Sequence, residues 1–509
     1  MFGWILRRLR WRAEGDAALV KRHSPFVRGG QRSGHRDIER QAEYYIGQMP
    51  TAAEDPRLGD VIDAYMTLHG LTSHAQMADV LGVERSLVSK YISGARTCRD
   101  IIQLRRFADR MELPPETFGL LSNRGPELPG RPNAGVTQWR TVRQILNRNR
   151  FELTAAAADL YWDPVRIEGT TCISRPDWLA PAPIDLEAVR LTLVEDVAEP
   201  VLNGGESETE PFRPQQRPGD RPDRYSQVVR SVAQPALFEN RTSYRLTDAT
   251  FDASGGKMTF GLTTYFDMVD VCEALAHEMA HQWIRRRSGQ RIRMEDLPFR
   301  QLVGDLFDTR RRAILPSINT LTIRRAPDGD TFFLHRRGSN TVTLASGLTH
   351  IVPAGVFQPA AIGPWNVHRD FSLWRNMLRE FFEELLDAPE HDGSRGTSVD
   401  YDCEPFRALT AAREAGKVRA WCFGVGLDPL APAGEILTTV IIDASVFDDV
   451  FAGLVARNSE GDIYPSDSGT IGIRWNAGNV RRVLNHEPLA AAAAACIALT
   501  WRHRGVLLP

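Results

Sequence analysis

The sequence predicts a multidomain chain in which an all-α domain is followed by an α/β domain. Three observations favour this fold class. Residues 71–119 carry short apolar runs with helical spacing that are separated by glycines. The part after Pro316 alternates strand-like and helical runs, and the stretches between these two parts are rich in proline and glycine, as linkers are. A length of 509 residues is enough for about three domains.

The composition is that of an ordinary globular protein, with 42% hydrophobic and 25% charged residues. A formal net charge of −2 provides no overall cationic field, so any affinity for nucleic acid must come from a local basic patch. The six cysteines have no paired spacing, and no apolar run approaches the ~20 residues of a membrane span. We therefore expect a cytoplasmic protein that does not enter a membrane.

Residues 1–55 differ from a packed domain because they are rich in arginine and interrupted by glycine. The first basic side chains are Arg7, Arg8, Arg10 and Arg12. They could form a basic arm for DNA phosphates or an amphipathic helix on a membrane surface. Alternatively, the protein starts at Met49. We expect a poorly ordered basic extension, because runs of charge are usually solvated.

Residues 56–122 are expected to hold two short helices joined by a tight turn. Ser73 precedes the first apolar run, as an N-cap does, and Gly82 and Gly94 end the first and second helices. A glycine suits the turn because two steeply crossing helices leave little room there. The expected buried residues are Met77, Ala78 and Leu81 in the first helix and Leu87, Val88 and Tyr91 in the second.

This segment resembles the helix-turn-helix domain of phage-repressor-like regulators, the XRE family. In such domains the second helix lies in the major groove of double-stranded DNA. The resemblance implies that four residues of that helix contact bases and phosphates: Arg85, Ser86, Ser89 and Lys90. His74 stands where the family usually has a glutamine, and it is included among the expected DNA-binding residues. We expect the protein to form a homodimer.

The middle of the chain is expected to be mostly connecting material. Residues 123–196 should form a linker and a helical segment. Few apolar side chains occur in residues 197–226, so this stretch is expected to be a disordered linker. Residues 227–315 are expected to form a connecting α/β region.

That region contains the sequence His277-Glu278-x-x-His281. On a helix, this spacing places two imidazoles on one face to bind zinc, with Glu278 as the base that activates a water molecule. Together with the upstream segment, the motif is similar to regulators that carry a metallopeptidase domain of the ImmA/IrrE type. The residues downstream contain carboxylates, but none in the helical setting that such peptidases use.

A second interpretation of the motif needs no metal. On a helical wheel, one face carries i,i+4 neighbours of alternating sign: Asp270, Glu273, His277, His281 and Arg285. A solvated ladder of charges explains this face. We therefore predict no stoichiometric zinc and assign no catalytic residue, with zinc bound by the two histidines as the alternative.

Residues 316–509 combine strand-like runs with a helix near residue 380 whose one face is acidic. Glu380, Glu383 and Glu384 fall within one arc of this helix. Three carboxylates on one face repel one another unless a divalent cation lies between them, and such hard oxygen ligands suit magnesium. A plain surface helix rich in glutamate is the alternative.

This strand, turn and helix series resembles a Nudix domain. The matching residues are Gly355, Arg379, Glu380, Glu383 and Glu384. The pattern departs from the family at Phe371, which occupies the place of a glutamate, and at Leu386, which replaces a glycine. The resemblance therefore implies a degenerate Nudix-like domain that binds a nucleotide-like molecule. The chain from residue 58 onward also resembles large actinobacterial helix-turn-helix proteins with such a C-terminal half.

These observations predict a sequence-specific DNA-binding transcriptional regulator whose C-terminal half senses a small, nucleotide-like molecule. Two enzymatic alternatives remain. One is a zinc metallopeptidase that uses Glu278, and the other is a magnesium-dependent hydrolase that uses the three glutamates. A scaffold that binds a protein partner is a further, non-enzymatic alternative.

Overall fold

The structure is a computed structural model, and it divides into two compact units, residues 10–130 and a second unit that contains residues 131–509. The described residues are 58–69, 71–96, 98, 101–111, 113, 134–161, 165–216, 219–235, 238–286, 290–337, 348–360, 365–386, 399–452, 461–463 and 472–509. The predicted basic extension, residues 1–55, lies outside them. No helix among the described residues has both the length and the apolar character that crossing a membrane requires.

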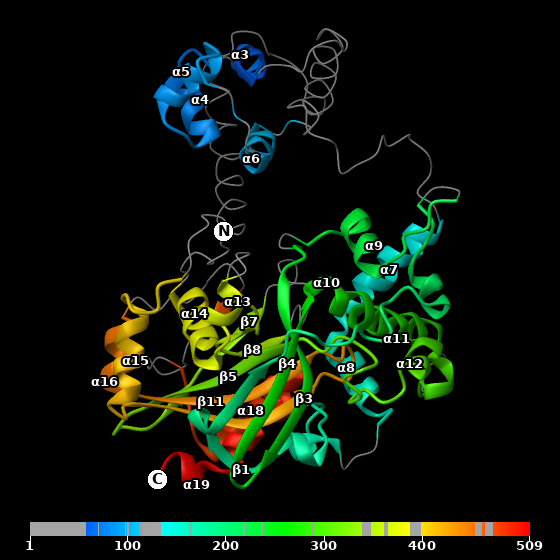
Figure 1. The fold of residues 1–509 in the computed structure, drawn as a ribbon, viewed down its shortest axis with the longest axis vertical. Coiled ribbons are helices and arrows are strands. Elements are labelled where there is room, and N and C mark those ends of the chain that lie inside the picture. The colour runs from blue at the N-terminus through cyan, green and yellow to red at the C-terminus, as the bar shows by residue number, and fades with distance from the viewer. Residues whose placement is uncertain are drawn as a thin grey trace, which may run out of the picture. The chain divides into compact units, whose positions relative to one another are not determined.

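The smaller unit is helical, and its helices are α3 (Leu58–Leu68), α4 (His74–Leu81), α5 (Arg85–Ile92) and α6 (Ile101–Met111). Its core contains Ile62, Met77 and Val88, each fully buried. Tyr91 packs edge-on against Phe107 of α6, with ring centroids 6.0 Å apart. The predicted pair of short helices joined by a tight turn is therefore confirmed (Figure 1).

The larger unit is built on a mixed sheet of seven strands. The order is β1 (Leu179–Asp185), β10 (Val418–Leu427), β11 (Gly434–Asp443), β5 (Pro316–Arg325), β6 (Thr331–Phe332) and β13 (Ile473–Arg474), and β9 (Ala354–Val356) also pairs with β5. Strands β11 and β5 run parallel, whereas the other neighbouring pairs are antiparallel. A continuous run of paired residues from Gly434↔Pro316 to Asp443↔Arg325 makes this parallel pair the centre of the sheet.

Two three-stranded sheets accompany the large one. The first contains β2 (Val189–Leu193), β4 (Gly255–Thr264) and β3 (Thr242–Asp252), and the second contains β12 (Gly461–Ile463), β7 (Leu334–Arg337) and β8 (Thr349–Ile351). The helices of this unit are α7 (Ala134–Arg148), α8 (Arg150–Ala158), α9 (Tyr225–Val232), α10 (Tyr265–Met268), α11 (Ala274–Arg285), α12 (Pro298–Val303), α13 (Asn366–Arg369), α14 (Leu373–Leu386), α15 (Phe406–Glu414), α16 (Ala444–Val450), α17 (Ala477–His486), α18 (Ala491–Arg502) and α19 (Arg504–Leu507).

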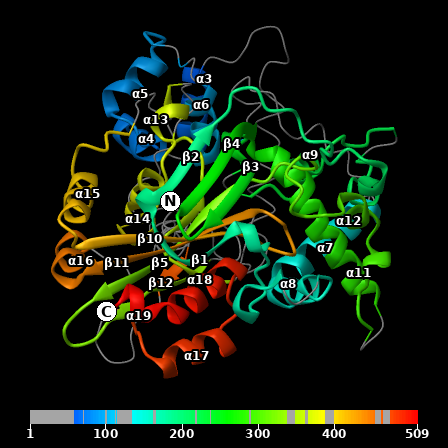
Figure 2. The ribbon, with the colours of Figure 1, turned by 60° about the horizontal axis from the view of Figure 1, so that its bottom comes forward.

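Alternation along the central strands gives the large sheet two buried faces. Ile318 and Ile436 belong to a core that α14 joins, whereas Leu321 and Leu437 belong to a second core that α18 fills. Successive side chains of a strand point to opposite faces, so the two helices cover opposite faces of the sheet (Figure 2). Nearly all of β11 is buried, as expected of a strand that is covered on both faces.

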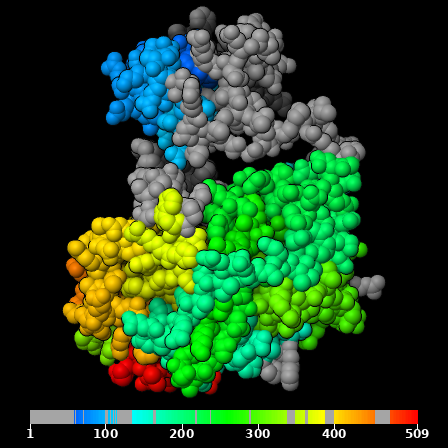
Figure 3. Space-filling model, in the orientation of Figure 1, coloured from blue at the N-terminus to red at the C-terminus, as the bar shows by residue number. Residues whose placement is uncertain are grey.

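The predicted fold class, an all-α helix-turn-helix domain followed by an α/β Nudix-like domain, is wrong. Strand β1 comes from the stretch that was expected to be linker and helix, yet it pairs with β10. Trp139 of α7 and Phe381 of α14 belong to one core. The described segments from residue 134 onward accordingly share one continuous body (Figure 3), and its architecture is α/β with several mixed sheets. Sequence periodicity indicates each strand but not its partner, which can lie far away in the chain.

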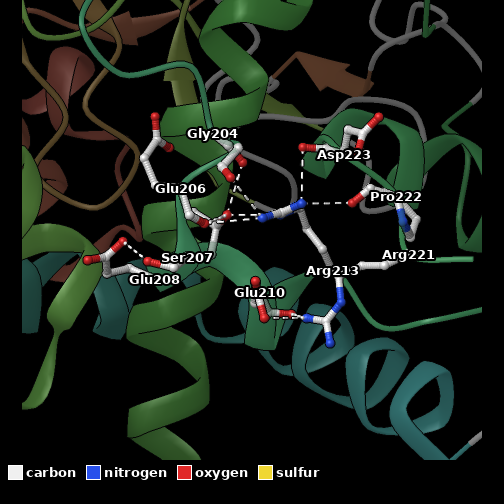
Figure 4. A network of polar contacts seen from close by, with 11 residues as sticks. Gly204, Glu206, Ser207, Glu208, Glu210, Arg213, Arg221, Pro222 and Asp223 are labelled. Atoms are coloured by element: carbon white, nitrogen blue, oxygen red, sulfur yellow. Dashed lines mark hydrogen bonds and ion pairs between the residues drawn. The ribbon is translucent and has the colours of Figure 1, made fainter. Parts of the chain in front are cut away.

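Residues 197–226 also differ from the predicted disordered linker, because one buried arginine organises them. Arg213 follows a 3-10 helix (Ser207–Phe212) and is 5% exposed. Its guanidinium donates to the Thr209 hydroxyl and to four backbone carbonyls, those of Gly205, Glu206, Pro222 and Asp223, at 2.9–3.1 Å (Figure 4). The low content of apolar side chains predicted disorder. Instead, the five N–H donors of the Arg213 guanidinium hold the stretch in place through these hydrogen bonds.

Candidate functional site

The exposed face of α5 gathers the residues that the sequence analysis assigned to DNA. Arg85, Ser86, Ser89 and Lys90 are all exposed on this helix. Val88 and Tyr91, on the opposite side, are 0% and 3% exposed and anchor the helix in the core. The face is therefore polar, carries two positive charges and is held by buried side chains beneath it.

The start of α4 holds the fifth assigned residue, His74, which is partly buried. The structure therefore places it on a different helix from the other four. Next to it, Ser73 and Gln76 form a reciprocal cap, of which only Ser73 was predicted from the sequence. The Gln76 side chain accepts the backbone N–H groups of Thr72 and Ser73 at 2.9 Å and 3.1 Å. The spacing Ser-x-x-Gln was the signal for this capping box.

The turn between α4 and α5 is closed by Gly82 and Arg110. Gly82 has φ 60° and ψ 43°, and its N–H donates to the Ala78 carbonyl. Arg110 of α6 donates to the Leu81 carbonyl. A Cβ atom built at Gly82 would lie 1.5 Å from the Nη1 atom of Arg110. Glycine therefore suits this left-handed backbone, and a Cβ atom here would also displace the Arg110 guanidinium from its place over the turn.

We expect Gly82→Ala to destabilise the α4–α5 pair by at least about 1–2 kcal/mol, the cost of a left-handed residue that carries a Cβ. Native-state hydrogen exchange of the α4 and α5 amides in the full chain measures this loss. Gly94→Ala is the matched control, because Gly94 has φ 71° but nothing within 4 Å of its Cβ position. A loss no larger in Gly82→Ala than in Gly94→Ala would contradict the role of Arg110.

A second polar cluster surrounds His277 in the larger unit. The ring of His277 is 2% exposed, stacks on Trp139 at 5.3 Å and has its Nδ1 atom 3.0 Å from the Tyr225 hydroxyl. Burial, helped by the nearby Arg143 guanidinium, lowers the pKa of His277 well below its ordinary value. His281 lies one turn further, partly buried. His277 is therefore a neutral core residue at physiological pH.

This burial makes a pH dependence that can be measured. The unfolded chain protonates His277 below about pH 6.5, whereas the folded chain does not, so stability should fall as the pH drops through that value. We expect the melting temperature of His277→Gln to fall less steeply between pH 6.5 and pH 5 than that of the unchanged protein. The control is His486→Gln, which makes the same substitution at an exposed position of α17. Equal pH profiles for His277→Gln and the unchanged protein would contradict the assignment.

Glu278 is the residue expected to act as the base if the protein is a zinc metallopeptidase. Its side chain is instead hydrogen-bonded to backbone amides. Its two carboxylate oxygens accept the backbone N–H groups of Phe299 at 2.7 Å and Arg300 at 3.0 Å. Glu278 thus caps the start of α12, and burial raises its pKa to about 7. Across the described part of the chain, no three His, Cys, Asp or Glu side chains are grouped so that they could hold a metal ion.

The interpretation of the neighbouring charges as a solvated ladder is wrong. Asp270 and Glu273 are 4% and 0% exposed. Asp270 accepts the N–H of Ser226 at 2.6 Å, and Glu273 forms hydrogen-bonded ion pairs with Arg143 and Arg150. Helices α7 and α8, together with the start of α9, supply these partners, and a wheel of one helix cannot reveal them.

Glu273 is charged although it lies inside the protein. Burial alone would raise its pKa, but the guanidinium groups of Arg150 and Arg143 hold the pKa below its ordinary value. Arg150 donates to Glu273 at 3.1 Å, and Arg143 donates to the same carboxylate. One carboxylate therefore joins α7 and α8 to the π-helical turn Val269–Glu273 that leads into α11.

The acidic helix α14 lies against strand β9. Glu384 is 2% exposed and accepts the N–H of Ala354 at 3.2 Å. A Cβ built at Gly355 would lie 2.0 Å from the carboxyl carbon of Glu380. The structure therefore places Gly355 against Glu380 and Ala354 against Glu384, while Glu380 and Glu383 are both partly exposed. Among the described residues, the three glutamates are not grouped so that they could hold a metal ion. The expected magnesium and nucleotide-like ligand stay predictions.

The chain matches no protein-family model, and no curated protein matches it. The family resemblances drawn from the sequence motifs therefore stay predictions. Function has to be inferred from the chemistry and geometry of the described residues.

Proposed function

We propose that the chain is a sequence-specific DNA-binding protein that regulates transcription and reads its site with α5. The observation that carries this proposal is the exposed polar face of Arg85, Ser86, Ser89 and Lys90 on a short helix whose other side is buried. A helix that enters a groove must present its side chains to base edges in one register, and the fixed turn and buried side chains of α5 support this.

The side chains of this face suit the major groove, which is wide enough to admit an α-helix. A guanidinium such as that of Arg85 can donate two hydrogen bonds to guanine O6 and N7. Ser86 and Ser89 can bond to bases or phosphates, and the ammonium group of Lys90 suits a phosphate. Two positive charges on one short helix provide the local basic patch that the net charge of −2 does not provide.

The proposal includes a homodimer. Two copies of α5 related by a two-fold axis would reach half-sites about one helical turn of DNA, ~34 Å, apart. The operator would then be an inverted repeat with a half-site spacing of about 10 base pairs.

Selection from random duplex DNA with the full chain tests the proposed function. We expect an enriched inverted repeat, bound more tightly than random duplex by at least about 1,000-fold at physiological salt. Affinity for that repeat should fall linearly with salt on logarithmic axes. Equal affinity for selected and random duplexes, or no binding at low salt, would contradict the proposal.

A further inference from the structure

Strand β2 forms one edge of the small sheet that also contains β4 and β3 (Figure 2). The N–H of Val194, at the end of β2, donates to the Phe260 carbonyl of β4 at 2.8 Å. Because the backbone groups of a strand alternate between its two sides, those of Leu191 and Leu193 point away from β4. Within the part of the chain that the structure describes, they have no hydrogen-bond partner. The outer side of β2 therefore offers a row of free donors and acceptors.

Two other sheet edges of this unit are closed to an incoming strand. At the opposite edge of the small sheet, the N–H of Leu246 in β3 donates to the Ile314 carbonyl at 2.8 Å. Strand β1, at one edge of the large sheet, contains Pro181 and Pro183, which have no N–H to donate. Strand β2 contains no proline, and its register with β4 is regular. Of these three edges, β2 is the one that another strand can join.

The exposed charges along β2 are separated by sign. Arg190 lies near the start of the strand, whereas Glu195 and Asp196 follow its end, and all three side chains are exposed. None of the three forms an ion pair with a described residue. The acidic residue just before the strand, Glu187, is instead paired with Arg413 at 3.4 Å. The strand therefore has a basic start and an acidic end.

We propose that β2 is the dimerisation edge of this protein and pairs antiparallel with the β2 strand of a second copy of the chain. This inference rests on the homodimer in the proposed function and names its interface. Antiparallel pairing places the basic start of one strand beside the acidic end of the other, twice across a two-fold axis. Parallel pairing would place like charges side by side. A second copy thus supplies both the backbone groups and the charges in the required order.

The apolar side chains of β2 suit the same partner. Leu191 and Leu193 are partly buried and pack against the core, which fixes the strand in place. Val194 is 37% exposed. Pairing with a second copy would cover more of these three side chains and would join two three-stranded sheets into one of six strands.

Two charge variants of the full chain test this inference. The acidic variant carries Arg190→Glu, so that both ends of its strand are acidic. The basic variant carries Glu195→Arg and Asp196→Arg, so that both ends are basic. Each variant should repel a copy of itself, whereas the two variants are complementary to each other. Sedimentation equilibrium without DNA measures the dimer dissociation constant of the unchanged protein, of each variant and of their equimolar mixture.

We expect the unchanged protein to dimerise and each variant alone to have a dissociation constant at least about 10-fold higher. The equimolar mixture should return to within about three-fold of the unchanged protein, because every opposed charge again has a partner of the other sign. High salt should reduce these differences, since exposed pairs are screened. The amides of Leu191 and Leu193 should exchange slowly in the unchanged dimer and rapidly in the acidic variant.

Matched controls make the same charge changes at exposed positions outside the small sheet. They are Arg481→Glu for the acidic variant, and Asp402→Arg with Asp449→Arg for the basic one. Each control should dimerise alone as the unchanged protein does. An equal loss of dimerisation in the controls would show that net charge, and not β2, determines the effect, and would overturn the inference.

The remaining outcomes separate this inference from the proposed function. Dimers of unchanged strength in either variant alone would overturn the β2 interface and leave the homodimer and DNA binding intact. Variants that stay monomeric both alone and when mixed would overturn the antiparallel pairing. A monomeric unchanged protein would overturn both this inference and the proposed homodimer, while selection from random duplex DNA tests DNA binding separately.

Discussion

Arg85→Ala should weaken binding to the selected duplex by about 5- to 150-fold and relax the preference at one base pair. The reason is that the exposed guanidinium of Arg85 on α5 can donate two hydrogen bonds to one guanine. Alanine can donate neither of them. Fluorescence anisotropy with the selected duplex, and with single substitutions in it, measures both effects. Stability should stay unchanged, because Arg85 is outside the core of this unit.

Lys90→Ala should weaken binding to all duplexes by a similar factor, with a fall of about one in the salt slope, because a phosphate contact carries no base information. Arg481→Ala is the control for both substitutions. It removes the same charge from an exposed position of α17 in the larger unit and should leave affinity unchanged. Affinity and salt slope that survive both Arg85→Ala and Lys90→Ala would rule out α5 as the DNA-contacting helix.

Glu273→Gln should lower the free energy of unfolding of the larger unit by about 3–5 kcal/mol. This substitution leaves the guanidinium groups of Arg143 and Arg150 buried without their counter-charge, and Arg150 is only 1% exposed. Urea-induced unfolding, followed by a probe in the larger unit such as tryptophan fluorescence, measures the loss.

The control is Glu404→Gln, which breaks an exposed pair with Arg407 at 2.8 Å. Both side chains of that pair are more than half exposed, so its loss should cost less than about 1 kcal/mol. Equal losses in the two variants would show that the charge of Glu273 contributes nothing beyond a surface pair.

The helix pair of the smaller unit could be predicted because its signals are local. Ser73 and Gly82 mark helix ends through hydrogen bonds and backbone angles within a few residues of themselves. The exposure of Arg85 and Lys90 follows from the same helical spacing. Nothing local, however, identifies Arg110 as the side chain that closes over the turn.

The surroundings of the His277 motif could not be predicted, because its partners come from distant segments. The amides that bind Glu278 lie at the start of α12, and the hydroxyl near His277 belongs to α9. A spacing of His-Glu-x-x-His is shared by helices that bind metal and helices that pack into a core. Only the elements packed around the helix show whether its histidines bind a metal or belong to the core.

The pairing of β1 with β10 could not be predicted from the sequence, for a similar reason. Both strands carry apolar residues, but the hydrogen-bonded partner of a strand is not encoded in its own periodicity. For the stretch around Arg213, the prediction was wrong in the opposite sense, because order was missed where disorder was expected. Its few apolar side chains predicted disorder, although one buried guanidinium collects carbonyls from both ends of the stretch.

The strand order of the large sheet also determines the order in which parts of the chain can fold during synthesis. Strand β1 is synthesised long before β10, its neighbour on the sheet, so the ribosome releases most of the larger unit before this edge can close. Until then β1 carries unpaired backbone groups that can join another chain. The helical unit needs no such wait, since its contacts are short in sequence. Its helices can therefore assemble while the sheet is still incomplete.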